Sequence, residues 1–100
     1  MSEDSLKQIE SHLRGLLDDT IEAQKQLVSK FESIKGSLEQ DEIEAYQTII
    51  TFGQNEIDTT EAELKATTLA EILNVPTIAH PNQYDAYRAA MFLQIRGKLV

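Results

Sequence analysis

The chain has 100 residues, of which 41% are hydrophobic and 26% charged, and its formal net charge is −8. This length allows one small core and leaves little room for a buried catalytic cleft, so we expect a single domain over residues 1–100. The negative charge argues against nucleic acid and anionic lipid as partners, because both would repel the chain. We find no secretory signal, no cysteine and no apolar run near the ~20 residues that cross a bilayer. These features predict a cytoplasmic protein with no membrane contact.

The first forty residues contain apolar side chains at three- and four-residue steps, with charged residues between them. This spacing predicts one amphipathic helix with an apolar stripe along one face. The α-helical stripe consists of Leu6, Ile9, Leu13, Leu16, Leu17, Ile21, Leu27, Val28, Phe31, Ile34 and Leu38. Its apolar residues are close to a seven-residue repeat over residues 6–16, but the repeat shifts after Ile21. Polar residues interrupt the stripe at residues 18–20 and 24–26. The pattern therefore predicts a helical bundle or an irregular coiled coil.

Helix-end signals suggest where this first helix begins and ends. Ser5-Leu6-Lys7-Gln8 has the form of a capping box, which predicts a start near residue 5. Gly36-Ser37 is typical of a helix end, and Ser37-Leu38-Glu39-Gln40 is a second capping box. We expect either a hairpin that folds back near Gly36 or one helix that continues through it, spanning residues 5–52 in both cases.

The rest of the chain predicts two shorter helices within residues 58–97. Gly53-Gln54-Asn55 indicates a turn, and Asp58-Thr59-Thr60-Glu61 is a further capping signature that would open the third helix. Proline restricts the Val75–Pro81 segment to an extended connector. Asn82 would cap the last helix, and Gly97 would end it. The predicted fold class is therefore all-α.

The length of the first helix bears on function. A helix over residues 5–36 would be ~50 Å long, whereas a compact 100-residue globule is roughly 35 Å across. Either the helix breaks near Gly15 or Gly36, or the molecule is elongated and another chain covers part of the stripe. Our main hypothesis is a non-enzymatic interaction protein that self-associates as a homo-oligomer or joins a larger assembly through the stripe.

A second candidate patch lies in the last predicted helix. Tyr84, Tyr87 and Met91, with Phe92, form the densest aromatic and apolar group in the chain. They would form either the core face of that helix or a protein-binding surface, since Tyr and Met are favoured where one side stays wet. The sequence leaves both alternatives open.

Two other functional hypotheses follow from charge and from a local pattern. Residues 1–65 have net charge −9, which suits a small acidic inhibitor or nucleic-acid mimic that blocks a basic surface. The acids for this role are Asp18, Asp19, Glu22, Glu39, Asp41, Glu42 and Glu44. Residues 68–76 loosely resemble the first helix and turn of a helix-turn-helix, which implies DNA binding, but Arg88, Arg96 and Lys98 are few for phosphate contacts.

The sequence supplies no catalytic or metal-binding constellation. His12 and His80 fall on different predicted elements, with no carboxylate at ligand spacing beside either. The paired acids lie on faces that the periodicity makes exposed, and the four glycines are scattered and form no phosphate loop. We therefore expect no enzyme activity, no metal and no cofactor.

Overall fold

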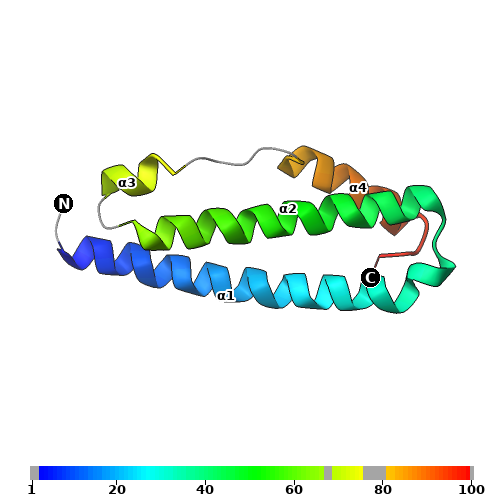
Figure 1. The fold of residues 1–100 in the computed structure, drawn as a ribbon, viewed down its shortest axis with the longest axis horizontal. Helices are drawn as coiled ribbons and strands as arrows, with labels where there is room; N and C mark the ends of the chain where they lie inside the picture. The colour runs from blue at the N-terminus through cyan, green and yellow to red at the C-terminus, as the bar shows by residue number, and fades with distance from the viewer. Residues whose placement is uncertain (1–2, 67–68, 76–80, 100) are drawn as a thin grey trace.

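The structure, a computed structural model, describes residues 3–66, 69–75 and 81–99. Every regular element in these ranges is helical, which confirms the predicted all-α class. The elements, in chain order, are α1 (Glu3–Ile34), the 3-10 turn η1 (Lys35–Ser37), α2 (Gln40–Lys65), α3 (Leu69–Leu73) and α4 (Gln83–Ile95). α1 and α2 form a long antiparallel hairpin, and α4 lies along one end of it (Figure 1). The molecule is a rod of 52 × 21 × 18 Å.

The hairpin folds back at the predicted position near Gly36. α1 ends at Ile34, and the Ser37 hydroxyl donates a hydrogen bond to the Ile34 carbonyl oxygen at 2.8 Å. The predicted capping box at Ser37 is wrong, because the box forms two residues later, between Glu39 and Glu42. There the Glu39 N–H donates to Glu42 Oε1 at 2.9 Å. The first predicted box also differs, since α1 already begins at Glu3 and Ser5 lies inside its first turn.

The predicted turn at Gly53-Gln54-Asn55 is wrong, because α2 runs through it without a break to Lys65. The predicted helix start at residues 58–61 consequently lies inside α2, and the element that follows is the five-residue α3. Gly53 does not form a turn but lies at a close contact between α1 and α2. A Cβ atom at this position would overlap the side chain of Gln24 from α1, so glycine allows α1 and α2 to approach closely there.

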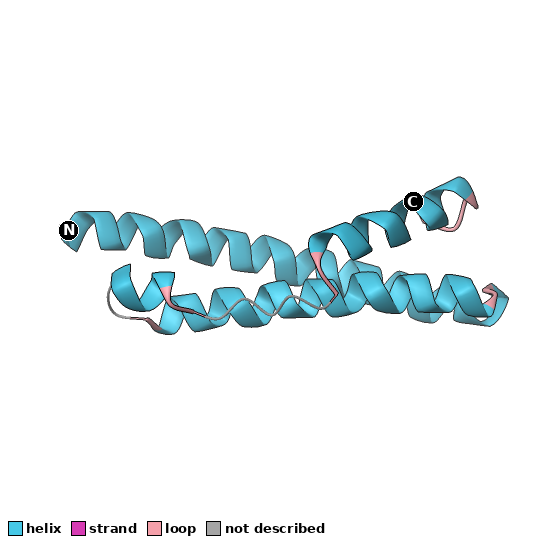
Figure 2. Cartoon of the chain, turned by 90° about the horizontal axis from the view of Figure 1, so that it is seen from above, coloured by secondary structure: helices cyan, strands magenta, loops and turns pink. Residues whose placement is uncertain are grey.

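The main buried cluster lies in the half of the rod near η1; we call this half the closed end and the other half the open end, where Leu13 and Ile57 are buried. Phe31 of α1, Ala45 and Tyr46 of α2 and Leu93 of α4 form one buried cluster, and the Phe31 and Tyr46 rings stack with centroids 5.3 Å apart. Tyr46 and Leu93 are completely buried. Figure 2 shows that α4 covers only this half of the hairpin. The rod therefore has three helices side by side at the closed end, and α1, α2 and the short α3 at the open end.

α4 begins at the predicted cap. The Asn82 side-chain oxygen accepts the Asp85 N–H at 2.9 Å, and Asp85 Oδ2 accepts the Asn82 N–H at 3.2 Å. Gly97, at φ +68°, turns the chain after the helix, in a conformation that other residues rarely adopt. Most of the predicted connector, residues 76–80 with His80, lies outside the described residues. None of the described helices is both long enough and apolar enough to span a membrane.

Candidate functional site

The apolar stripe of α1 faces α2 of the same chain over most of its length. Leu13 and Phe31 are buried, and Leu16 is the most exposed member, at 46%. The partly buried members are Leu6, Ile9, Leu17, Ile21, Leu27, Val28, Ile34 and Leu38. Leu27, Ile34 and Leu38 pack directly against the core cluster. The hairpin therefore already covers most of the surface that the periodicity marked as an interface.

At the open end, the stripe borders a hollow between α1, α2 and α3. Its volume is about 360 Å³. The apolar wall consists of Leu6, Ile9, Leu13, Leu64, Ala66 and Ile72. Glu10, Glu63 and Lys65 line the same hollow. The apolar wall can receive apolar side chains of another molecule.

The patch predicted in the last helix forms the outer face of α4. Tyr84 is 65% exposed, Tyr87 63% and Met91 42%, so these three side chains are not part of the core. Ile95, which is 82% exposed, extends the same row by one turn. Successive members are three or four residues apart and therefore share one side of the helix. We call Tyr84, Tyr87, Met91 and Ile95 the outer α4 face.

The inner side of α4 is also apolar. Ala86 and Leu93 are buried, and Ala89 and Phe92 pack against the core cluster. Phe92, which the sequence grouped with the tyrosines, thus belongs to the inner side. A helix that is apolar all round is typical of a buried helix. Only one side of α4 is covered by the described part of this chain.

Arg88 lies on the outer side of α4, between these apolar residues. Its guanidinium stands over the Tyr84 ring, 4.8 Å from the ring centroid. Among the described residues the other two arginines have acidic partners, Glu10 for Arg14 and an acidic cluster for Arg96, whereas Arg88 has none. The outer α4 face therefore presents an aromatic surface, and the Arg88 cation that is held against it has no acidic partner among the described residues.

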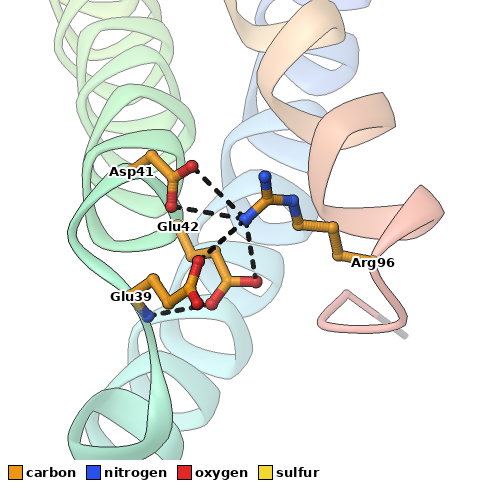
Figure 3. A network of polar contacts seen from close by, with 4 residues as sticks. All are labelled: Glu39, Asp41, Glu42 and Arg96. Carbon is orange, nitrogen blue, oxygen red and sulfur yellow. Dashed lines mark hydrogen bonds and ion pairs between the residues drawn. The ribbon is translucent and has the colours of Figure 1, made fainter.

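Arg96 joins the end of α4 to the start of α2 (Figure 3). Its Nη1 atom lies 3.2 Å from Glu39 Oε2, 3.3 Å from Asp41 Oδ2 and 3.8 Å from Glu42 Oε2. Glu42 is 3% exposed. Three of the acids that we considered for an inhibitor surface are thus paired with an arginine of the same chain, although Glu39 and Asp41 remain exposed. The sequence did not indicate this network, because Arg96 is far from the acids along the chain.

The described residues contain no group of three or more potential metal ligands. His12 lies on the exposed side of α1, away from α2. Comparison of the chain with protein-family models, with curated proteins and with solved structures found no match.

Proposed function

We propose that this protein is a non-enzymatic assembly protein that self-associates or joins a larger complex through the outer α4 face. One observation carries the proposal: α4 is apolar on both sides, and the described residues cover its inner side alone. Single exposed apolar residues are normal on a protein surface, but an aligned row of large ones is typical of an interaction site. The row from Tyr84 to Ile95 is about 16 Å long, which is enough for the face of a partner helix.

The composition of the outer α4 face also supports a protein partner. Tyrosine and methionine are enriched at interface cores, and arginine is a frequent hot-spot residue. Full burial of an apolar side chain of this size contributes about 1.5–3 kcal/mol. The four side chains of the outer α4 face are 42–82% exposed, so a partner would bury the remaining part of each and gain several kcal/mol towards the entropic cost of association.

This proposal moves the contact surface from the α1 stripe, where the sequence placed it, to α4. α2 covers most of the stripe, so the stripe would have to separate from α2 before it could bind another chain. The acidic-inhibitor hypothesis has less support, because Arg96 pairs with three of its seven acids. We propose the cytoplasm as the compartment, on the composition argument given above.

A photo-reactive amino acid placed at Tyr87 tests the proposal in the cells that make the protein. We expect illumination to produce a covalent adduct with a protein, because position 87 lies within the proposed contact. The matched control places the same amino acid at Glu22, an exposed position on α1. Adducts at neither position, or at both equally, would show that the outer α4 face is not a specific contact surface.

A further inference from the structure

We infer that the outer α4 face is covered by the open half of a second copy of this chain, packed antiparallel to the first. This inference rests on the proposed function and names the partner. We define the open half as residues 3–25, 54–66 and 69–75, and the closed half as residues 26–53 and 81–99.

The distribution of exposed apolar side chains points to the open half. Among the described residues, the large exposed apolar side chains outside α4 are Leu16, at 46%, and Leu73, at 74%. Both belong to the open half, and the hollow lined by Leu6, Ile9 and Ile72 lies there as well. The described part of the chain therefore has an incompletely covered apolar region in each half. Each could cover the other if two copies met.

The charge distribution favours the same pairing. The open half contains eleven acids and four bases, net −7, whereas the closed half contains six acids and five bases, net −1. Arg88, the arginine without an acidic partner among the described residues, lies on the outer side of α4 in the closed half. Contact between unlike halves brings this cation to the most acidic part of the second copy. Contact between like open halves would instead oppose two strongly negative surfaces.

The shape of the rod makes this pairing reciprocal. α4 begins near the middle of the rod and runs to the closed end, while α3 lies on the same side of the hairpin at the open end (Figure 1). A two-fold axis across the middle of the rod places each α4 beside the open half of the other copy. The same contact then forms twice and closes the dimer, as is usual for symmetric homodimers.

The main alternative is a homodimer in which the α4 helices of the two copies pack on each other. In that arrangement the two Arg88 guanidiniums would approach one another within an apolar contact, at a cost in free energy. It would also leave Leu16 and Leu73 exposed. The antiparallel arrangement accounts for both apolar regions and for the unpaired cation.

Cysteine cross-linking distinguishes these arrangements, because the sequence contains no cysteine of its own. α3 lies at the open end and the last turn of α4 at the closed end, on the same side of the hairpin (Figure 1), so the proposed two-fold axis brings Leu73 of one copy near Ile95 of the other. Both side chains are exposed, so we expect a mixture of the purified L73C and I95C chains to form the mixed dimer with a short bis-maleimide. We expect M91C alone to form little cross-linked dimer, whereas efficient M91C cross-linking would establish the α4-on-α4 arrangement and overturn the inference.

Sedimentation velocity of the unmodified chain supplies the second measurement. We expect an elongated species of twice 11.3 kDa that dissociates on dilution. Arg88→Glu should weaken the dimer roughly tenfold or more, whereas Arg88→Lys, which keeps the charge, should weaken it less. Circular dichroism checks that both variants keep the helical fold.

The outcomes separate this inference from the proposed function. A monomer at every concentration, combined with adducts of a different protein at position 87, would overturn the second copy as partner and leave the proposed function standing. A monomer without any specific adduct at position 87 would remove both.

Discussion

In the middle of the hairpin, the side-chain amide of Gln24 occupies the space beside Gly53 where any other residue would carry its Cβ atom. Gln24 Nε2 donates a hydrogen bond to the Ile50 carbonyl oxygen at 2.7 Å, one turn earlier in α2. A polar residue of α1 therefore crosses the seam and is satisfied by the backbone of its neighbour. The contact depends on the glycine, because no other side chain leaves room for the amide.

This contact predicts that Gly53→Ala will not give the stability that alanine usually adds inside a helix. Glycine to alanine in a helix interior is worth about 1 kcal/mol. At Gly53 the new Cβ would displace the Gln24 amide and break its hydrogen bond, which contributes about 1 kcal/mol, so the net change should be near zero. Urea unfolding followed by circular dichroism gives the free energy of unfolding of the variant and of the unmodified chain.

Gly15→Ala is the matched control, because Gly15 lies inside α1 and a Cβ there would contact nothing within 4 Å. We expect this variant to be more stable than the unmodified chain by about 1 kcal/mol. Gly53→Ala should recover a similar gain in a Gln24→Ala background. Equal gains from Gly53→Ala with and without Gln24 would show that the two residues are not coupled.

The same contact shows why part of the fold could not be predicted from the sequence. The cap at Asn82 depends on residues next to it and was predicted correctly, and the hairpin near Gly36 is one of the two alternatives that the local signals allowed. The role of Gly53 depends on Gln24, which is distant along the chain, so a local pattern indicated a turn where α2 continues.

The candidate site could be predicted only in part, for a different physical reason. Periodicity identified the aromatic patch of the last helix but could not say which side of that helix faces inward, because both sides are apolar. The structure turns the side with Ala86 and Ala89 towards the core, since small residues let α4 approach α2 closely. The larger Tyr84 and Tyr87 are left outside.

The second prediction concerns Arg96. Arg96→Ala should destabilise the fold by about 1–2 kcal/mol, because it leaves the buried Glu42 carboxylate without its cation. It also removes the contact of the guanidinium with the Phe92 ring, 4.3 Å from the ring centroid. Chemical denaturation gives the free energy of unfolding. The control is Arg14→Ala, which breaks an exposed pair within α1 and should cost less than about 0.5 kcal/mol. Equal losses in the two variants would show that Arg96 acts only as a surface charge.

The third prediction concerns stability at high pH. The Tyr46 side chain is completely buried, and its hydroxyl donates to the Lys98 carbonyl oxygen. Burial raises the pKa of Tyr46 above its ordinary value of 10.0. Because the folded state favours the neutral phenol, this contribution to stability is fully present below pH 10.0 and is lost as the pH rises through the raised pKa.

Tyr46→Phe isolates that effect. At neutral pH the variant should lose about 1 kcal/mol with the hydrogen bond to Lys98. Above pH 10.0 the difference from the unmodified chain should shrink, because phenylalanine has no proton to lose. Denaturation curves of both proteins from neutral to alkaline pH test this, and a difference that stays constant across the range would contradict it.

The fourth prediction separates the two sides of α4 with residues of similar size, Leu93 and Ile95. Leu93 is completely buried and Ile95 is 82% exposed. Leu93→Ala should lower the free energy of unfolding by about 2–5 kcal/mol, because it opens a cavity in the core. Ile95→Ala should change the stability of the dilute protein by less than about 0.5 kcal/mol.

If the outer α4 face is an interface, however, Ile95→Ala should weaken association by removing apolar area that only the partner covers. Unfolding at low concentration and sedimentation equilibrium at high concentration measure the two effects independently. Unchanged association in Ile95→Ala and Tyr87→Ala would mean that the outer α4 face contributes nothing to assembly.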